Sequence, residues 1–513
     1  MEAQLIALIT TTSFVGVAII LLIRLYNALV KEPERLRGLL RKQGISGPPP
    51  TFLLGNILEI KKARSNASAK PRDSVVSGHN CATTLLPFFE NWRKQYGNMF
   101  MFSLGNTQIL YINQPEVVKD ITTCISLDLG KPSYQQRERG SLLGRGILTS
   151  NGAVWAHQRK ILGPELAVDK VKGMIDLIAK SSIAMVDKWM DLVDGGVADI
   201  NIDEHMRNFS GDVISRACFG SNYVQGEEIF LKLRALQEIA SKKTFSTGIP
   251  GMRHLPTKSN RETWTLEREV KELVLKVVKE RKKVGHENDL LQMVLEGARN
   301  THLSQEATDQ FIVDNCKNIY LAGYETTAVA ASWCFMLLAS NPDWQDRIRK
   351  EVLQLVPTGE TPDSNMLRKM KQVSMVINET LRLYPPVPVI SREALKDMKF
   401  GNLNVPKGVN VWTITLTTHT DPTIWGPNSY EFNPERFSNG IMGACKLPYM
   451  YMPFGVGPRV CLGQNLAMTE LKILIATIVS KFSFTLSPTY VHSPSVSLVV
   501  EPKHGVSLMV KKL

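Results

Sequence analysis

The chain has 513 residues, 43% of them hydrophobic, and a net charge of +13 from 61 Lys and Arg against 48 Asp and Glu. This length would allow about three domains, but no flexible linker divides the chain after residue 85, so a single large fold is predicted. The seven cysteines are scattered without a C-x-x-C pair, which indicates neither a zinc site nor a disulfide framework and fits a reducing compartment. The basic balance comes without an aromatic-interleaved motif for nucleic acid, so it favours an anionic membrane surface and an acidic protein partner.

The N-terminal segment is long and apolar enough to cross a membrane. Residues 3–23 carry no formal charge, and as a helix they would span about 30 Å. Basic residues gather directly after them, from Arg24 to Lys42, so the positive-inside rule places the N-terminus in the lumen and the rest in the cytosol. We predict a single-pass anchor at residues 1–25 in the endoplasmic reticulum membrane. A cleaved signal peptide is the alternative, but the segment has no basic n-region and no obvious cleavage site.

The segment after the anchor is predicted to connect it to a cytosolic body. Residues 26–50 form a basic juxtamembrane segment and end in Gly47–Pro50, whose consecutive prolines stiffen the chain into a hinge. A simple turn is the alternative for these prolines. The body is expected over residues 51–513, and polar, turn-rich residues 63–84 predict an exposed loop within it.

The pattern of the body is typical of a mainly α fold with a small β region. Short strand-like segments occur at residues 99–102 and 108–112, and helical periodicity dominates from there to residue 384. Strand-like stretches return at 387–392 and 409–416, and again near the carboxyl end.

A long helix is predicted from Ser304, which can cap it, to Ala339, and at about 1.5 Å per residue it would cross a whole domain. Small residues at its middle, Ala322 and Gly323, would let a flat ligand approach the backbone, and the helix can distort there and free a carbonyl. Glu325 and Thr326 follow as an acid–alcohol pair suited to moving protons. Taken alone, this run is also typical of an ordinary capped helix.

Two further charged patterns lie on predicted helices. Trp155 and Arg159 stand at i and i+4 on one face, which by itself is typical of a stacked surface pair. Glu379 and Arg382 stand at i and i+3 in an apolar stretch, so we expect a buried ion pair rather than an exposed one of little energy. A buried pair needs further partners, and Arg436 is a candidate.

The loop Phe454–Gly463 places one cysteine, Cys461, at the start of an apolar-periodic helical segment. The helix dipole and free backbone N–H groups there are expected to lower the pKa of the thiol. Such a thiolate can be the single protein ligand of a haem iron and favours O–O cleavage. Gly457 and Gly463 permit close backbone approach to a flat ligand, and Arg459 can pair with a porphyrin propionate. A buried structural cysteine is the alternative.

This loop is similar to the haem-binding loop of the cytochrome P450 superfamily, F-x-x-G-x-R-x-C-x-G, at every fixed position. The superfamily's other signatures occur in its order, at 155–159, 322–327, 379–382 and 434–437. With the anchor, the chain resembles a eukaryotic microsomal member. Two narrower features resemble the plant seventy-two clan: Ile249–Lys258 and Leu383–Pro388. Within that clan, four further segments resemble the seven-hundred-and-fourteen family: Leu143–Gly146, Ser150–Gly152, Ile214–Gly220 and Phe432–Phe437.

The resemblance implies a cytochrome P450 fold with haem b between the long central helix and the Cys461 loop. It implies haem contacts from Trp155, Arg159, Arg392, Phe454 and Arg459, and proton delivery to bound dioxygen by Glu325 and Thr326. A structural network of Glu379, Arg382 and Arg436 is implied behind the loop. Substrate contacts are implied for mostly apolar residues: Leu142, Leu148, Ala322, Val387, Val389, Ile390 and Val496.

The function implied is that of a haem-thiolate monooxygenase, which inserts one oxygen atom of O2 into a C–H bond. Electrons would come from NADPH through a separate NADPH-cytochrome P450 reductase, because the chain has no pyridine-nucleotide fingerprint. Family members oxidise gibberellins and their diterpenoid precursors, and another branch oxidises methyl groups of pentacyclic triterpenoids. We favour a hydrophobic pentacyclic triterpenoid, oxidised to an alcohol or on to an acid, with a gibberellin or ent-kaurenoid diterpenoid as the alternative. A reductase-independent haem-thiolate isomerase or dehydratase and a non-catalytic haem protein are rival classes.

Overall fold

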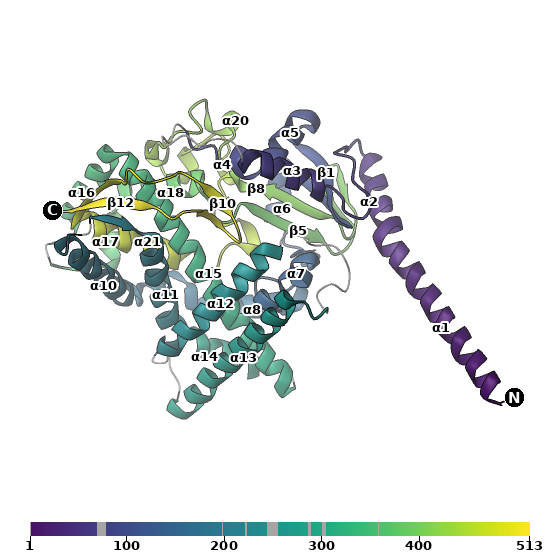
Figure 1. The fold of residues 1–513 in the computed structure, drawn as a ribbon. Helices are drawn as coiled ribbons and strands as arrows, with labels where there is room; N and C mark the ends of the chain where they lie inside the picture. The colour runs from purple at the N-terminus through teal and green to yellow at the C-terminus, as the bar shows by residue number, and fades with distance from the viewer. Residues whose placement is uncertain are drawn as a thin grey trace.

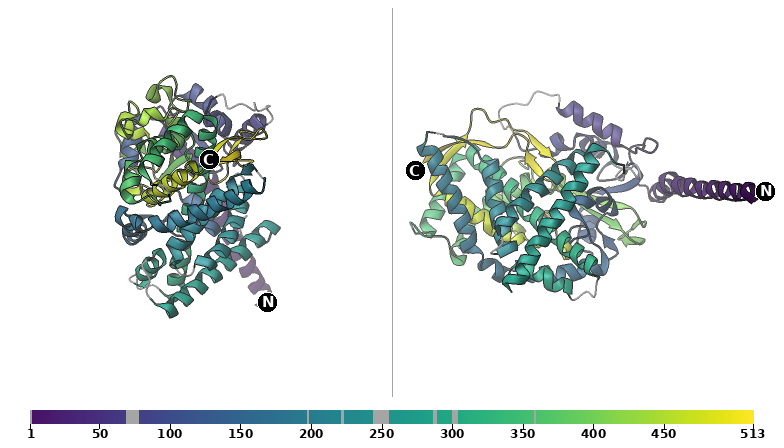
Figure 2. Two further views of the ribbon diagram at one scale, coloured as in Figure 1. Left: turned by 90° about the vertical axis from the view of Figure 1, so that its left-hand side faces the viewer. Right: turned by 60° about the horizontal axis from the view of Figure 1, so that its bottom comes forward.

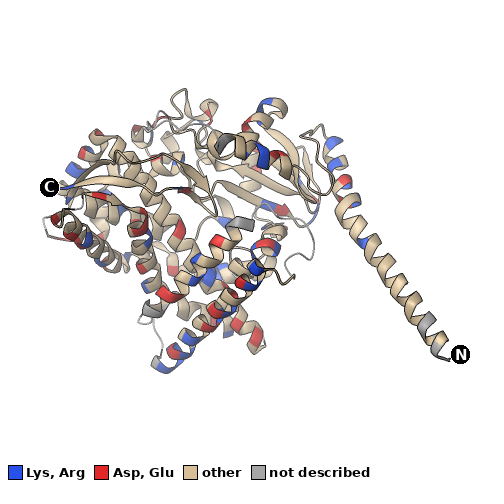
Figure 3. Cartoon of the chain, viewed as in Figure 1, with Lys and Arg blue, Asp and Glu red and all other residues tan. Residues whose placement is uncertain are grey.

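The computed structural model describes residues 2–68, 78–196, 198–220, 223–243, 255–285, 289–299, 304–357 and 359–513. It begins with a long helix, α1 (Glu2–Tyr26), which a π-helical turn (Asn27–Lys31) joins to α2 (Glu32–Arg41). α1 projects away from the globular body, as Figure 1 and the right-hand view of Figure 2 show. The run Ile9–Arg41 contains a membrane-length window of mean hydropathy 2.1 that is wholly unburied, and α1 is almost free of charged side chains (Figure 3). α1 is thus a candidate membrane span, as the sequence predicts.

The second helix belongs to the body. Leu36 and Leu40 of α2 are buried in one apolar cluster with Leu110 and Ile112 of β2 (Thr107–Ile112). The chain after residue 26 therefore does not run free to the proline-rich segment. It packs on the sheet first, which fixes the direction in which α1 leaves the body.

A five-stranded sheet lies at the end of the body nearest to α1 (Figure 1). Its order is β1-β2-β8-β5-β3, and β2 pairs with β8 in parallel while the other pairs are antiparallel. These strands are β1 (Met99–Leu104), β2, β3 (Leu129–Gly130), β5 (Val389–Ala394) and β8 (Asn410–Ile414). The strands predicted at 99–102, 108–112, 387–392 and 409–416 are confirmed in position. Smaller sheets are formed by β4 (Asp199–Asn201), β9 (Phe482–Leu486) and β12 (Ser507–Lys512), by β6 (Met398–Phe400) and β7 (Leu403–Val405), and by β10 (Pro494–Val496) and β11 (Val500–Pro502).

Helices make up the rest of the body. In chain order they are α3 (Ile57–Ser68), α4 (Cys81–Leu85), α5 (Pro87–Tyr96), α6 (Pro115–Thr123), α7 (Ser133–Leu143), α8 (Gly152–Leu162), α9 (Val168–Lys172), α10 (Ile175–Asp194), α11 (Asp203–Phe219), α12 (Tyr223–Lys243), α13 (Lys258–Val284), α14 (Leu290–Arg299), α15 (Gln305–Ser340), α16 (Pro342–Leu355), α17 (Ser364–Lys369), α18 (Lys371–Leu383), α19 (Thr415–Thr418), α20 (Pro422–Trp425) and α21 (Gln464–Val479). Short 3-10 turns at Pro434–Phe437, Pro448–Met450 and Gly457–Arg459 shape the segment before α21. The predicted mainly α fold with a small β region is confirmed.

The longest helix, α15, runs through the core. Ser304 caps it by accepting a hydrogen bond from the Ala307 N–H at 3.3 Å, and it ends before Pro342, as predicted. Its apolar window is 83% buried, so its hydrophobicity serves packing rather than a membrane. The expected distortion at Gly323 is wrong, because the helix is unbroken there. A Cβ on Gly323 would lie 2.6 Å from Cδ1 of Ile214 on α11, so the glycine allows close packing of these two helices.

The expected exposed loop at residues 63–84 is also wrong in part. Residues 63–68 continue α3, and residues 81–85 form α4, in which Cys81, Ala82 and Leu85 are buried. The side chain of Asn80 caps α4 by accepting from the Thr83 N–H at 3.3 Å. Polar composition predicted a loop here, but one cap and three apolar side chains suffice for a short buried turn of helix. The middle of the predicted loop lies outside the described residues.

Candidate functional site

The Cys461 loop lies between the 3-10 turn Gly457–Arg459 and α21. The Cys461 N–H donates to the Phe454 carbonyl at 2.8 Å, which closes the loop on itself. The backbone N–H groups of Gly463 and Gln464 point at the Cys461 sulfur and lower the pKa of its thiol, as expected for the start of a helix. Burial has the larger and opposite effect, so the pKa of the free thiol is raised overall. The predicted lowering is therefore wrong for the thiol alone, because desolvation outweighs the backbone donors.

Cys461 combines this burial with accessible surface. The residue is exposed, whereas burial dominates the shift of its pKa. Both observations hold together when the sulfur lies deep in the body and faces a space inside it. The other cysteines of the described chain are buried or half-buried, so Cys461 is distinguished by its surroundings as well as by its motif.

Four basic side chains surround the same region. Arg159 on α8 donates to the Val460 carbonyl at 2.6 Å, next to Cys461. Arg392 on β5 is buried, and desolvation lowers its pKa to about 10. Burial together with the charges of Arg392 and Arg159 lowers the pKa of Arg459 to about 10 as well. Lys131, which follows β3, has its pKa lowered to about 7 by burial and by Arg392 and Arg459.

The structure brings Trp155 to this cluster through a partner that the sequence did not indicate. Its ring stacks on the guanidinium of Arg459 at 4.0 Å, rather than on Arg159 one turn away. Nη1 of Arg459 is buried without a hydrogen-bond partner in the described part of the chain. Lys131 was missed entirely by sequence reasoning, since it precedes a proline outside any recognised motif. Its place directly after β3, which pairs with β5, brings it near enough to Arg392 for the charge of Arg392 to lower its pKa.

Gly457 does not act as predicted, whereas the role predicted for Gly463 stays a prediction. Gly457 has a φ of +71°, and a Cβ there would lie 2.3 Å from the Thr122 carbonyl of α6. It therefore permits close packing against α6 and not the approach of a flat ligand. A Cβ on Gly463 would meet nothing within 4 Å, so space rather than contact surrounds that position.

The acid–alcohol pair lies at the middle of α15, but its two side chains have different partners. Thr326 is partly buried, and its hydroxyl donates to the Ala322 carbonyl at 2.7 Å. Glu325 is buried, and its Oε2 accepts from Nη1 of Arg207 on α11 at 2.6 Å, while its Oε1 has no partner among the described residues. Arg207 also contacts Asp203 at 3.2 Å and Glu501 at 2.9 Å.

Arg207 is a residue that sequence reasoning missed. Although its burial lowers its pKa, Glu325 and Asp203 raise the pKa of Arg207 overall, so it remains a cation. Burial raises the pKa of Glu501, with Glu325 adding to the rise and Arg207 opposing it. One cation thus holds three carboxylates from α11, α15 and β11, which leaves an excess of negative charge beside Glu325.

The predicted ion pair on α18 is fully buried. Both oxygens of Glu379 accept from Arg382, at 2.7 and 2.8 Å, and both side chains are 0% exposed. Arg436 lies 3.5 Å from the same carboxylate, and the Asn433 N–H donates to it at 2.9 Å. Arg382 also donates to the carbonyls of three residues in the segment before the Cys461 loop: His419, Ser429 and Glu431. The expected burial and the third partner are confirmed.

The residues expected to contact substrate come from four parts of the fold. Leu142 on α7 is 1% exposed and Leu148 is half-buried, as is Ala322 on α15. Val389 and Ile390 begin β5 and are half-buried, whereas Val387 before it is 44% exposed. Val496 ends β10 and pairs with Val500, whose N–H donates to the Pro386 carbonyl at 2.9 Å. That bond ties the C-terminal hairpin to the start of β5.

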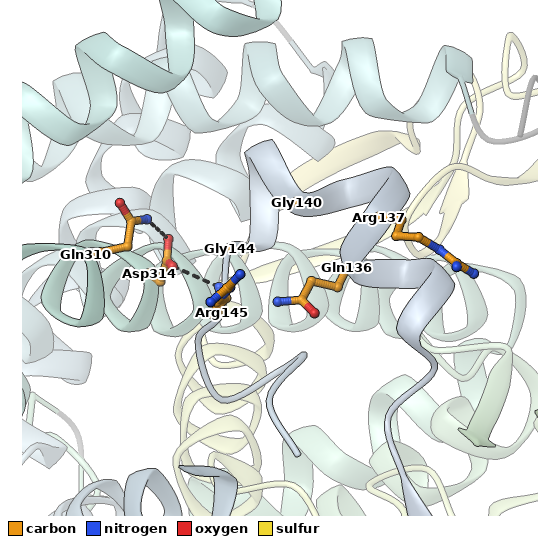
Figure 4. A pocket seen from close by; sticks show the side chains of 7 residues that line it. All are labelled: Gln136, Arg137, Gly140, Gly144, Arg145, Gln310 and Asp314. Carbon is orange, nitrogen blue, oxygen red and sulfur yellow. Dashed lines mark hydrogen bonds between the residues drawn. The ribbon is translucent and has the colours of Figure 1, made fainter. Parts of the chain in front are cut away.

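A separate cavity of about 400 Å³ opens between α7 and α15 (Figure 4). Within it, Asp314 accepts hydrogen bonds from the Gln310 side chain at 2.9 Å and from the Arg145 N–H at 2.8 Å. None of the predicted site residues lines this cavity, so it is distinct from the Cys461 region. Its lining is Gln136, Arg137, Gly140, Gly144, Arg145, Gln310 and Asp314.

The Cys461 region fits a flat, doubly anionic cofactor whose metal binds sulfur. The sulfur faces an internal space, the four basic side chains beside it form no ion pair within the described part of the chain, and Nη1 of Arg459 is a buried donor without a partner there. The residues present therefore fit haem, with Cys461 for the iron and Trp155, Arg159, Arg392 and Arg459 for the propionate side. These features define the class: a mainly α haem-thiolate protein.

Comparison with known proteins agrees with that class. The family model "Cytochrome P450" matches residues 76–509. The chain is 48% identical over 507 residues to cytochrome P450 714C2 of Oryza sativa subsp. japonica, covering 96% of each chain. It is 45% identical over 499 residues to cytochrome P450 714A2 of Arabidopsis thaliana, covering 94% of this chain and 95% of the relative. It is also 45% identical over 502 residues to cytochrome P450 714B3 of Zea mays, covering 96% and 94%.

The chain therefore belongs to the cytochrome P450 family, and its relatives place it among the plant members numbered 714. It is a monooxygenase of that family. The predicted resemblance to the cytochrome P450 superfamily is confirmed, and so is the narrower resemblance to its seven-hundred-and-fourteen family. One of the segments that suggested it, Ile249–Lys258, lies largely outside the described residues.

Proposed function

We propose that this monooxygenase oxidises a C–H bond of an apolar polycyclic terpenoid, a pentacyclic triterpenoid in first place, with electrons from NADPH through a separate reductase. The observation that supports the haem chemistry is the Cys461 thiol, which lies deep in the body yet is accessible and stands beside basic side chains that form no ion pair with any described residue. The half-buried apolar residues Leu148, Val389 and Val496 support a hydrophobic substrate, since apolar pockets with few polar groups suit rigid hydrocarbons.

Bound haem supplies the activation of dioxygen, and the chain's own residues prepare the site for it. Cys461 would hold the iron, and because a thiol that coordinates a metal is deprotonated, the raised pKa of the free thiol does not oppose this role. Arg159 is held in place by the Val460 carbonyl, and Arg459 by the Trp155 ring, so both guanidinium groups are oriented before the cofactor binds.

Glu325 and Thr326 would manage protons at Oε1 and Oγ1. Oε2 of Glu325 is bonded to Arg207, so Oε1, which has no partner among the described residues, is the oxygen that can take up and pass on a proton. The negative charge that Asp203 and Glu501 add beside Arg207 favours protonation of one member of the group. The hydroxyl of Thr326, now bonded to the Ala322 carbonyl, can rotate to hold a proton elsewhere.

The test is co-expression of the full chain with a plant reductase in yeast, fed with a pentacyclic triterpenoid in one arm and an ent-kaurenoid diterpenoid in another. We expect NADPH-dependent oxidation of the triterpenoid. Product from the diterpenoid alone would support the gibberellin-type alternative. Product without NADPH would establish the isomerase or dehydratase class, and binding of haem without product from either scaffold would leave a non-catalytic haem protein.

Two variants separate the residue roles in that assay. Cys461→Ser should remove the thiolate type of Soret band from the reduced carbon-monoxide spectrum, and a retained band would exclude Cys461 as the iron ligand. Thr326→Ala should leave that spectrum unchanged but lower the amount of product formed per NADPH consumed. Unchanged product per NADPH would contradict the proton role.

We also propose that α1 anchors the protein in the endoplasmic reticulum membrane with a luminal N-terminus. The unburied apolar window of the N-terminal helix and the basic residues of α2 support this orientation. Deletion of residues 2–26 should release much of the protein into the soluble fraction. A protease added to intact microsomes should digest the body of the full chain, whereas protection of the body would reverse the orientation.

A further inference from the structure

The cavity between α7 and α15 has a polar wall that one face of α7 supplies. Gln136, Gly140 and Gly144 are spaced four residues apart, so they lie on the same side of this helix, toward the cavity (Figure 4). A Cβ on Gly140 would meet nothing within 4 Å, whereas a Cβ on Gly144 would collide with the carboxylate of Asp314. Gly140 therefore leaves the cavity open, and Gly144 allows the chain to lie directly on α15.

Polar side chains of α15 hold the segment after α7 by its backbone. The side chain of Asn318 accepts from the Leu148 N–H at 2.8 Å and donates to the Leu143 carbonyl at 2.6 Å. Between these two residues, the Arg145 N–H donates to Asp314 at 2.8 Å. The backbone from which the Arg145 side chain extends is thus fixed at several points, so this wall of the cavity is organised before any ligand arrives.

The negative charge of Asp314 is already compensated within the protein. Asp314 is 1% exposed, and Nζ of the equally buried Lys317 lies 3.2 Å from its Oδ1. The same oxygen accepts from the Gln310 side chain at 2.9 Å. A buried carboxylate with a buried counterion and two further donors attracts a cation from solvent only weakly. The other charged groups of the lining are Arg137 and Arg145, so the cavity has a positive potential.

The lining offers a ligand a cationic donor and a neutral acceptor. The Arg145 side chain is exposed and forms no hydrogen bond or ion pair with any residue that the structure describes. The amide nitrogen of Gln310 donates to Asp314, so its Oε1 remains as an acceptor on the other side of the group (Figure 4). A guanidinium pairs with carboxylate or phosphate oxygens, and a carboxamide oxygen accepts from a hydroxyl group.

We propose that this cavity binds a small anionic molecule that carries an acid group, either a carboxylate or a phosphate, together with a hydroxyl group. Arg145 binds the acid group, Arg137 adds positive charge, and Oε1 of Gln310 accepts from the hydroxyl. The volume of about 400 Å³ has room for a hydroxy acid or a phosphate ester of a small polyol. The cavity lies apart from the Cys461 region, so the site is additional to the proposed oxidation and does not depend on it.

The test is isothermal titration calorimetry with the purified full chain in detergent at constant ionic strength. Citrate and glycerol 3-phosphate are the probes, one for each kind of acid group. Their matched controls lack only the hydroxyl groups: tricarballylate for citrate and propyl phosphate for glycerol 3-phosphate. At least one probe should bind saturably and more tightly than its control, and that pair identifies the acid group. If neither probe bound, or if each bound no better than its control, the proposal would be overturned.

Two substitutions locate the site of the bound probe. Arg145→Gln keeps the backbone contact with Asp314 but removes the charge, so the probe should bind about tenfold more weakly, the effect of one charge-assisted hydrogen bond. Gly140→Leu places a side chain in the open space of the cavity and should abolish binding without loss of stability. Arg368→Gln changes an exposed arginine on α17 and is the control with unchanged affinity. Wild-type affinity in either cavity variant would overturn the assignment.

Gln310→Leu tests the acceptor. It removes the oxygen that accepts from the hydroxyl, so the affinities for the probe and its control should become equal, whatever the substitution does to both of them together. A preference for the probe that matched the wild type would show that Gln310 does not recognise the hydroxyl.

Chemical modification of the wild type gives a measurement that needs no variant to fold. Phenylglyoxal, which reacts with accessible guanidinium groups, followed by mass spectrometry should modify Arg145 much less when the probe is present. Arg368 should react equally with and without the probe. Equal modification of Arg145 under both conditions would overturn the proposal even if calorimetry detected binding, because the anion would then lie elsewhere on the protein.

Discussion

A single carboxylate, that of Glu379, connects α18 with the segment that leads to the Cys461 loop. It accepts two hydrogen bonds from Arg382 and one from the Asn433 backbone. One residue before it, the Asn378 carbonyl accepts from the Tyr451 hydroxyl at 2.9 Å. Charges that are fully desolvated need such complete pairing, since their attraction only then offsets the cost of burial. The ion pair therefore joins α18 to the segment before the loop, and we expect it to support the loop rather than to act in catalysis.

Glu379→Gln should be strongly destabilising. The substitution keeps the shape of the side chain but leaves the wholly buried guanidinium of Arg382 without its counterion, a change worth about 3–5 kcal/mol. The measurements are the urea midpoint of the detergent-solubilised chain and the haem content after expression. Glu435→Gln is the control, because its ion pair with Arg347 is 2.6 Å long but about half exposed on both sides, and surface pairs contribute about 1 kcal/mol or less. Equal effects of the two substitutions would contradict the structural role of Glu379.

At the scale of elements, the contact between α11 and α15 sets the position of the acid–alcohol pair. Gly323 lies one turn before Thr327 and faces Ile214, while Arg207, two turns earlier on α11, reaches Glu325. The distance between the two helix axes therefore decides whether the Arg207–Glu325 contact forms. Small residues at a helix crossing allow such close approach, and a larger one forces the helices apart or a side chain off its rotamer.

Gly323→Ala should destabilise the protein by about 1–2 kcal/mol. The new Cβ would lie 2.6 Å from Cδ1 and 3.3 Å from Cβ of Ile214, and the cost of overpacking exceeds the gain of about 1 kcal/mol in helix propensity. Ile214→Val removes the nearest methyl group, so the double variant should recover most of the loss. Gly38→Ala on α2, where a Cβ meets nothing within 4 Å, should be neutral or stabilising. Denaturant midpoints of the wild type, the three single variants and the double variant give the test, and a double variant no more stable than Gly323→Ala would refute the proposed collision.

At the scale of the whole molecule, local chemistry could be predicted and long-range pairing could not. The cap at Ser304, the strands of the main sheet and the buried pair on α18 depend on residues close in sequence, so their patterns were readable. The stacking of Trp155 on Arg459 joins residues far apart in the chain, and so does the contact of Arg207 with Glu325. No periodicity encodes such contacts. The pKa of Cys461 was misjudged for the same reason, since desolvation is a property of the assembled body.

Two buried histidines make the stability of the assembled body depend on pH. Burial, with a contribution from Arg382, lowers the pKa of both His79 and His419 from 6.5 to about 3. His79 lies 2.8 Å from the Tyr384 hydroxyl, and Nε2 of His419 accepts from the Met452 N–H at 3.0 Å. Above pH 6.5 both histidines are neutral in the folded and unfolded chain. Between pH 6.5 and 3 only the unfolded chain takes up protons, so stability is lost as the pH falls through this window.

Below pH 6.5, each histidine should lower the free energy of unfolding by about 1.4 kcal/mol for every pH unit. Between pH 7.5 and pH 5, each histidine should therefore lower it by about 2 kcal/mol. His79→Asn and His419→Gln place an amide near the ring nitrogen that each histidine uses, without a titrating group. Between pH 7.5 and pH 5, each single variant should lose about 2 kcal/mol less unfolding free energy than the wild type does. The double variant should lose about 4 kcal/mol less than the wild type. Urea midpoints at the two pH values provide the measurement. His504→Gln changes an exposed histidine and is the control, so its loss of unfolding free energy between the two pH values should equal that of the wild type. If the double variant lost as much stability as the wild type, other groups would be responsible for the effect of acid.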